Sequence, residues 1–450
     1  MTSRPFDLLG YLPDDAEPRQ RVRLERTWLG LAAATFAVVA YLDFDNLLVS
    51  VSVVGALAKI AYIALVAGAF GILTLQRGQF RRGLPEAWVL LGFMIAAAAG
   101  YVTQMAAGRA PNSYLAAFMP PVLYSLSLVL PLPRKPVDGN GLVRALTVLL
   151  MVLGALYALE VTVRSASGNL GRIDNLENHV KSVSLVLAAG LAMASGRWRL
   201  LAVIVALSTW TTLQRPSSTF ILALSVCLSV AWLIKIGQSR LAECVCYALL
   251  AVLALSPFVV SFVPGASEMV LGVEGMLKQD LLGGETNTAV RLVIQGVAMN
   301  GMQGFDWVYG QLFTGATSVY VADMLPWWWD NSDLGLATIH SDYVILLGQS
   351  GLIGYVAYSA CLAALCRRGF RANANEGVDD VAVRAVFPIC VVALGIYSAA
   401  NPFLQYYQIS HVVWLCLGLA QYALLAIGAR HHSSVVENVC PESERGSSQS

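Results

Sequence analysis

The sequence predicts an all-α polytopic membrane protein with about twelve transmembrane helices and one large external loop between the ninth and the tenth. Of its 450 residues, 57% are hydrophobic and 13% are charged, whereas roughly a quarter of the residues in an ordinary soluble domain are charged. The apolar residues gather in long runs, and the basic residues gather in the polar segments between those runs. Both patterns indicate a chain that crosses a membrane many times.

The apolar runs give the number of spans. A membrane helix needs about 20 mostly apolar residues, because its backbone polar groups must satisfy one another within the lipid. The expected spans are 28–42, 47–75, 87–107, 114–132, 142–163, 183–194, 198–213, 219–234, 242–263, 341–366, 385–400 and 411–427. The chain is thus divided into an N-terminal segment (1–27), the first nine helices (28–263), the large loop (264–339), the last three helices (340–428) and a polar tail predicted to be disordered (429–450).

The basic residues indicate the orientation of the spans. Lys and Arg accumulate on the cytoplasmic side of membrane proteins, and here they alternate as a chain with both termini in the cytoplasm requires. The segments assigned to the cytoplasm carry Arg19, Arg21, Arg23, Arg26, Arg77, Arg81, Arg82, Arg134, Lys135, Arg197, Arg199, Lys235, Arg240, Arg367, Arg368, Arg371 and Arg430. The external segments carry only Arg109, Arg164, Arg172, Lys181, Arg215, Lys278 and Arg291. Since orientation does not require positive charge there, each of these is a candidate functional residue.

The large external loop is predicted to be folded. Loops of this length are usually functional or disordered, but residues 286–299 place apolar side chains at positions 290, 293, 294, 297 and 298, the spacing of an amphipathic helix. Thr286 or Asn287 would cap the start of that helix. The tryptophans at 327–329 fit either an aromatic belt at the membrane interface or a buried aromatic cluster.

The motifs of several common enzyme and transporter classes do not occur in the sequence. It contains no Walker P-loop, no dinucleotide-binding glycine fingerprint, no paired zinc-ligand spacing and no nucleophile-elbow serine. We therefore expect no ATP-driven transport, no metal and no cofactor, and no nucleic-acid partner. Lys59 and Glu160 are the clear ionisable residues within spans, which are few for an ion-coupled transporter. The role of Lys59 stays open.

Charged residues at the external face point to an anion-binding site. Arg215 comes just before the eighth span, where serine hydroxyls can cap the helix, and the tenth span starts at the same face, after His340. Arg291 lies on the amphipathic helix of the loop, and a guanidinium is suited to bidentate contact with phosphate. A histidine, with a reference pKa of about 6.5, can be neutral there and accept a hydroxyl proton. The alternatives are a packed or capping histidine and arginines that contact lipid headgroups. Accessory candidates are Arg109, Arg164, Arg172, His179 and Asp342.

Residues 338–354 read Thr-Ile-His-Ser-Asp-Tyr-Val-Ile-Leu-Leu-Gly-Gln-Ser-Gly-Leu-Ile-Gly. They resemble a motif of the O-antigen ligase and polymerase superfamily, in which a His-Ser pair ends the long periplasmic loop and a Gly-Leu-Ile-Gly stretch follows in the next span. The resemblance extends to the about twelve spans with one large periplasmic loop late in the chain. Near Arg291 the sequence departs from the family, because Gln295 and the turn at 300–305 stand where many members have a Trp and a Pro-containing turn. The glycines at 348, 351 and 354 are predicted to serve packing, since small residues let membrane helices approach closely.

The resemblance implies a glycan transfer at the periplasmic face of the bacterial inner membrane. Its donor would be an oligosaccharide linked to undecaprenyl diphosphate, with Arg215 and Arg291 holding the diphosphate and His340 orienting or deprotonating the acceptor hydroxyl. The favoured reaction is an inverting, metal-independent polymerisation of repeat units into O-antigen or exopolysaccharide, and transfer to lipid A core by a ligase is the alternative. The implied partners are the lipid bilayer and the flippase and chain-length regulator of the same pathway. A flippase for lipid-linked oligosaccharide and a non-catalytic assembly subunit remain open as functions of other classes.

Overall fold

The computed structural model describes residues 85–108, 118, 121, 124, 139–166, 181–214, 216–275, 288–315, 318–320, 336–371, 378–401, 403–404 and 410–424. In this part of the chain the fold is almost entirely helical, and helices occupy nine of the predicted spans. Six of the described helices are long and apolar enough to cross a membrane. The spans predicted at 28–42 and 47–75, and most of 114–132, lie outside the described residues. The count of twelve therefore stays a prediction.

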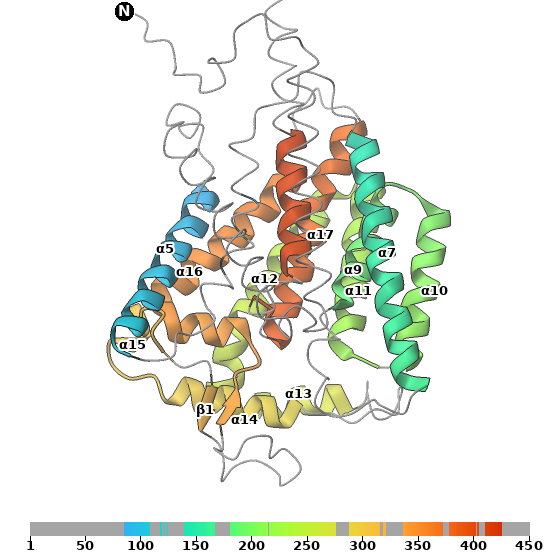
Figure 1. The fold of residues 1–450 in the computed structure, drawn as a ribbon. Coiled ribbons are helices and arrows are strands. Elements are labelled where there is room, and N and C mark those ends of the chain that lie inside the picture. Colours follow the sequence, from blue (N-terminus) through green and yellow to red (C-terminus); the bar gives the residue numbers. More distant parts are fainter. Residues whose placement is uncertain are drawn as a thin grey trace, which may run out of the picture.

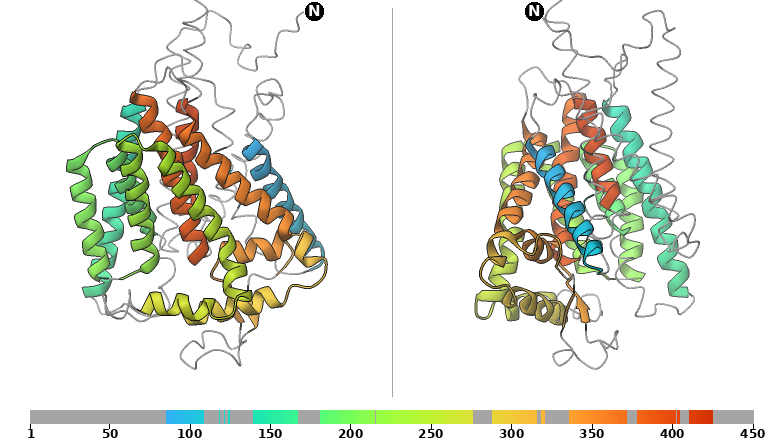
Figure 2. Two further views of the ribbon diagram at one scale, coloured as in Figure 1. Left: turned by 180° about the vertical axis from the view of Figure 1, so that it is seen from behind. Right: turned by 60° about the vertical axis from the view of Figure 1, so that its left-hand side comes forward.

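The helices form a bundle with shorter elements across one end (Figure 1). The six long helices are α5 (Pro85–Ala106), α7 (Gly139–Ala166), α11 (Ser218–Lys235), α12 (Ser239–Phe262), α16 (Asp342–Phe370) and α17 (Val378–Ala400). The shorter bundle helices are α9 (Val183–Ala194), α10 (Trp198–Gln214) and the helix Ser410–Leu424. Two further helices, α13 (Ala266–Gly275) and α14 (Thr288–Asn300), lie across the end of the bundle in all the ribbon views (Figures 1 and 2).

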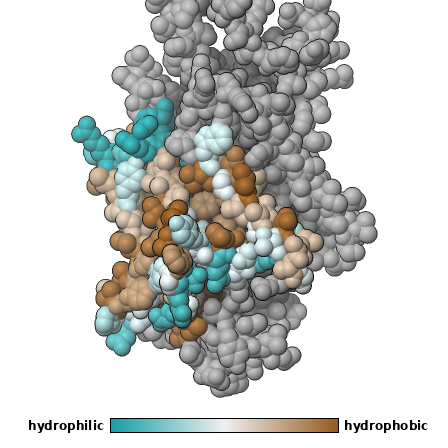
Figure 3. Space-filling model, turned by 90° about the vertical axis from the view of Figure 1, so that its left-hand side faces the viewer, coloured by the Kyte–Doolittle hydropathy of each residue, from teal (hydrophilic) through white to brown (hydrophobic). Residues whose placement is uncertain are grey.

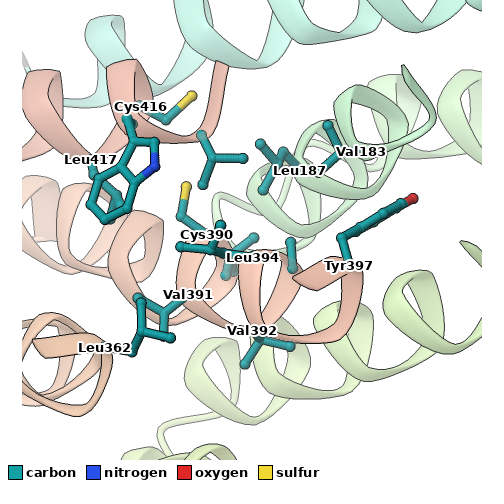
Figure 4. Close-up of a cluster of buried hydrophobic side chains, with 14 of the residues drawn as sticks. Val183, Leu187, Leu362, Cys390, Val391, Val392, Leu394, Tyr397, Cys416 and Leu417 are labelled. Atoms are coloured by element: carbon teal, nitrogen blue, oxygen red, sulfur yellow. The ribbon is translucent and has the colours of Figure 1, made fainter. Parts of the chain in front are cut away.

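Helix α17 forms the centre of the bundle. Of its apolar span, 89% is buried, and it packs against α16, α11 and α9. Figure 4 shows Leu394 of α17 among side chains that include Leu187 of α9 and Cys416 of the helix Ser410–Leu424. A Cβ atom added to Gly190 of α9 would lie 2.8 Å from Cγ2 of Ile389. In lipid, the hydrophobic effect does not drive helices together, so close packing has to stabilise the bundle. Small residues such as Gly190 allow this close packing.

The outer surface of the described helices is apolar, as a lipid-facing surface requires. On α5, Val102 is exposed, and on α16 Ile353 and Val356 are exposed. Figure 3 shows the face on this side of the molecule: apolar side chains dominate its middle, and hydrophilic side chains gather above and below them. This distribution supports a membrane protein.

The segment between α12 and α16 is folded in its described parts. Helix α14 confirms the predicted amphipathic helix: Ile294 and Met299 are buried, whereas Val293, predicted on the apolar face, is exposed. The candidate caps and the tryptophans at 327–329 lie outside the described residues. The structure adds helix α15 (Asp306–Tyr309) and a short antiparallel pair, β1 (Ser318–Tyr320) and β2 (Leu336–Thr338), which the sequence did not predict.

Helix α16 is broken at Gly351, which has φ 62° and ψ −170°. The break frees backbone carbonyls of the first half of the helix, and in a membrane protein such groups must find partners within the protein. The chain after α15 supplies them: the N–H of Gln311 donates to the Gly348 carbonyl at 2.9 Å and the N–H of Phe313 donates to the Gln349 carbonyl at 3.1 Å. The side-chain oxygen of Gln349 also accepts the N–H of Gly315 at 3.1 Å. These hydrogen bonds attach the segment after α15 to the middle of α16.

The three glycines of the motif in α16, at 348, 351 and 354, differ in their surroundings. A Cβ atom at Gly351 would lie 2.2 Å from the Val308 carbonyl oxygen, and one at Gly354 would lie 3.2 Å from a ring carbon of Phe93 on α5. The close approach of membrane helices predicted for these glycines is confirmed at Gly354, whereas Gly351 lies against the loop helix α15 at the break. Among the described residues, no atom lies within 4 Å of a Cβ atom added at Gly348, so the described structure shows no such approach there.

Replacing Gly351 by alanine is expected to lower the thermal unfolding temperature of the detergent-solubilised protein. The added methyl group would clash with backbone atoms of α15, and alanine disfavours the left-handed φ of this position, which together cost on the order of 2 kcal/mol or more. Gly348→Ala is the matched control in the same helix and is expected to leave the unfolding temperature unchanged or slightly raised. Equal unfolding temperatures for the two variants would show that the break does not depend on glycine.

At the opposite end of the bundle, α5 and α16 are joined by a buried ion pair. Glu86 at the start of α5 is 2% exposed, and its Oε1 accepts hydrogen bonds from Nε of Arg368 and, at 3.1 Å, from the hydroxyl of Tyr124. Arg368 was predicted only as a cytoplasmic orientation signal. The structure gives it a second role, because a buried carboxylate requires a charged partner.

Candidate functional site

His340 lies in the short link between β2 and α16, and α14 packs against both α16 and β1, the partner strand of β2. It is 3% exposed. The predicted helix start is confirmed, since α16 begins at Asp342 with Ser341 in extended conformation at its N-cap position. The β1–β2 pair ends two residues before His340, and it therefore fixes the direction from which the chain enters the helix.

Arg291 of α14 lies near His340. Burial, and after it the positive charge of Arg291, together lower the pKa of His340 from 6.5 to about 3. A pKa lowered in this way keeps His340 neutral near neutral pH, the form that can accept a proton. Nη1 of Arg291 donates a hydrogen bond to the Ala400 carbonyl at 2.8 Å. The fold thus brings together two of the three main candidate residues, which the sequence could place only at the same face.

Asp342, an accessory candidate, is 3% exposed and accepts the backbone N–H of Leu404 at 2.8 Å through its Oδ2. Ala400 is the last residue of α17, and the turn that follows begins there and includes Leu404. Arg291 and Asp342 therefore contact the same turn at its two ends.

Arg215 lies outside the described residues. The helix start beside it is described: Ser217 is the N-cap of α11, and its hydroxyl accepts the N–H of Phe220 at 3.4 Å. The predicted serine cap is confirmed. Arg109, Arg172 and His179 also lie outside the described residues, and Arg164 is described only in its backbone.

A buried polar cluster next to the turn was not predicted as a unit. Lys181 is 3% exposed and pairs with Glu160 of α7 at 2.9 Å. The hydroxyl of the neighbouring Ser182 lies 2.5 Å from the hydroxyl of Tyr397 on α17, and the Tyr397 ring lies 5.6 Å from that of Phe403 in the turn. The sequence signalled Lys181 only as one of the external basic residues. Its carboxylate partner lies in the preceding predicted span, 21 residues earlier in the chain, so no local pattern indicated the pairing.

Among the described residues, no three His, Cys, Asp or Glu side chains are grouped as a metal site would require. Comparison with models of protein families and with curated proteins gives no match for this chain. The chemistry of the site is therefore argued from its own residues.

Proposed function

We propose that this chain is a membrane glycosyltransferase that polymerises repeat units carried on undecaprenyl diphosphate, at the periplasmic face of the bacterial inner membrane. The observation that carries the proposal is the buried His340, just before the helix that bears the superfamily-like motif, close enough to Arg291 for the positive charge of Arg291 to lower its pKa. A neutral imidazole can accept a proton, and a guanidinium can hold a diphosphate. Both groups are needed to move a glycan from a diphosphate to a hydroxyl.

In the proposed reaction, the oxygen of an acceptor sugar hydroxyl forms a bond to the anomeric carbon of the donor glycan. The bond between that carbon and the diphosphate oxygen breaks, and the leaving diphosphate keeps the electron pair. The hydroxyl proton passes to His340 and from there to water. Arg291, together with Arg215, stabilises the negative charge that develops on the diphosphate.

The electrostatics of the free site suit an enzyme that is activated by its donor. In the free protein the charge of Arg291 contributes to the low pKa of His340, which makes the imidazole a weak base. A bound diphosphate offsets that positive charge, so it raises the pKa of His340 when the donor is in place. Proton acceptance is thereby coupled to donor binding.

An apolar groove of about 620 Å³ between α12 and α16 supports a lipid-linked substrate. Its walls include Phe258 of α12 and Tyr343 and Tyr355 of α16, and Tyr343 directly follows Asp342 in the chain. None of His340, Asp342 and Arg291 lines the groove, and Tyr343 is the lining residue nearest to them in the chain. An isoprenoid chain fits such an environment, because it needs no polar partners.

The test is elongation by the purified protein. The protein in detergent or proteoliposomes is supplied with undecaprenyl-diphosphate oligosaccharide as both donor and acceptor, and products are analysed by gel electrophoresis and mass spectrometry. A ladder of longer lipid-linked glycans is expected. Transfer that occurs only after lipid A core is added would identify a ligase instead, and inactivity with both acceptors would favour a flippase.

A further inference from the structure

The turn after α17 is buried and internally bonded. The N–H of Asn401 donates to the Tyr397 carbonyl at 2.9 Å, and the N–H of Phe403 donates to the Asn401 carbonyl at 2.8 Å. Phe403 and Leu404 are buried, and Phe403 packs against the Tyr397 ring. A buried turn of this kind must have its remaining backbone groups satisfied by neighbouring elements.

Two neighbouring elements satisfy backbone groups at the ends of the turn. Asp342 at the start of α16 accepts the N–H of Leu404 at 2.8 Å, and Arg291 of α14 donates to the Ala400 carbonyl at 2.8 Å. His340 lies two residues before Asp342, and the positive charge of Arg291 lowers its pKa. We call the ring of contacts the two hydrogen bonds to the turn together with the electrostatic interaction between Arg291 and His340.

We propose that Asp342 is a positioning residue, which holds the turn at Leu404 and thereby keeps the Ala400 carbonyl where it fixes Arg291 beside His340. This inference rests on the proposed function for its effect on catalysis, but the ring of contacts itself is independent of any reaction. In this proposal the side chain of Asp342 acts on Arg291 through the turn. It needs a hydrogen-bond acceptor at this place and no proton transfer.

The opposite side of the turn is held by the polar cluster at α9. The 2.5 Å contact between the hydroxyl groups of Ser182 and Tyr397 fixes the ring against which Phe403 packs. The contacts with Asp342 and Arg291 hold the side of the turn that faces α14 and α16. Loss of the Asp342 contact would release that side, and with it the carbonyl that holds Arg291.

The test compares Asp342→Ala with Asp342→Asn. Asparagine keeps an acceptor oxygen of the same reach, so Asp342→Asn should retain activity within about threefold of the wild type, whereas a displacement on the order of 1 Å at Arg291 should lower kcat for Asp342→Ala by up to about 100-fold. In an Arg291→Ala background, Asp342→Ala should have little further effect, because two residues of one network are not additive. Equal loss in Asp342→Ala and Asp342→Asn, or an additive double variant, would overturn the inference.

Hydrogen–deuterium exchange measured by mass spectrometry gives a second readout that does not depend on activity. In peptides that cover 400–404, exchange should be faster in Asp342→Ala and unchanged in Asp342→Asn. If the wild-type protein does not elongate glycans but the two variants differ in exchange as expected, the proposed function fails and the ring of contacts stands. Unchanged exchange in Asp342→Ala would overturn the inference whatever the activity. If Asp342→Ala does not fold, Asp342→Asn still decides, because an inactive but folded Asp342→Asn contradicts a role as acceptor only.

Discussion

Replacing His340 by alanine is expected to abolish glycan elongation, with kcat lowered by about 10²- to 10⁴-fold, the usual contribution of a general base. The imidazole is buried, lies beside Arg291 and is neutral, so its loss removes the group that accepts the hydroxyl proton in the proposed reaction. Initial rates of ladder growth measure the effect.

Folding of the His340 variants must be shown separately, because the side chain is buried. His340→Gln fills a similar volume and keeps hydrogen-bonding groups but cannot act as a base near neutral pH, so it is the matched control. It should unfold near the wild-type temperature and be as inactive as His340→Ala. Substantial activity in His340→Gln would mean that His340 orients the acceptor without taking its proton.

The pKa of His340 also predicts the pH dependence. The neutral form is the active one, and the pKa of about 3 in the free protein means that protonation removes it only at strongly acidic pH. Because kcat/KM reports the free enzyme, it should stay flat from about pH 8 down to about pH 5. The acid limb of kcat should lie at higher pH than that of kcat/KM, since bound diphosphate raises the pKa of His340. An acid limb of kcat/KM near the ordinary histidine pKa would contradict a buried, neutral His340.

Replacing Arg291 by alanine is expected to lower kcat by about 10²- to 10³-fold, comparable to the loss of one preorganised donor at a site of developing negative charge. The guanidinium group holds the diphosphate in the proposed reaction, and its hydrogen bond to the Ala400 carbonyl fixes its place. The change also removes a positive charge beside His340. The pKa of His340 should therefore rise, and the acid limb of kcat/KM should move to higher pH.

Arg291→Lys separates charge from geometry. Lysine keeps the positive charge and so should leave the pH profile close to that of the wild type, but it cannot make a bidentate contact, so kcat should lie between those of wild type and Arg291→Ala. Thermal unfolding in detergent serves as the control for the lost contact with Ala400. Full activity of a folded Arg291→Ala would remove Arg291 from the site.

Much of the local structure follows from the sequence. The helices at 183–194, 198–213 and 219–234 were predicted to within one residue at each end, because long apolar runs in lipid have few alternatives to a helix. The amphipathic helix that carries Arg291 and the helix start after His340 were also predicted, since both depend on local spacing. Whether a segment forms a helix depends mainly on its own residues, so a single sequence can predict it.

The sequence alone did not predict the break in α16, because hydropathy is the same on both sides of Gly351 and glycine is common in membrane helices. Nor did it predict the β1–β2 pair, whose strands are three residues long and separated in the chain. The Lys181–Glu160 pair escaped prediction for a related reason: Glu160 lies in a predicted span and Lys181 in the external segment after it, and no local pattern indicates that the two side chains meet.

In the candidate site, too, some features could be predicted from the sequence and others depend on the tertiary structure. The sequence by itself determined the residue types and the face of the membrane on which they are expected, because charge and helix starts are read along the chain. Only the tertiary structure decided that Arg291 lies beside His340 and that Arg291 and Asp342 contact one turn. Those contacts join α14, α16 and the end of α17, three elements far apart in sequence, and their geometry is set by packing around α17 rather than by any local pattern.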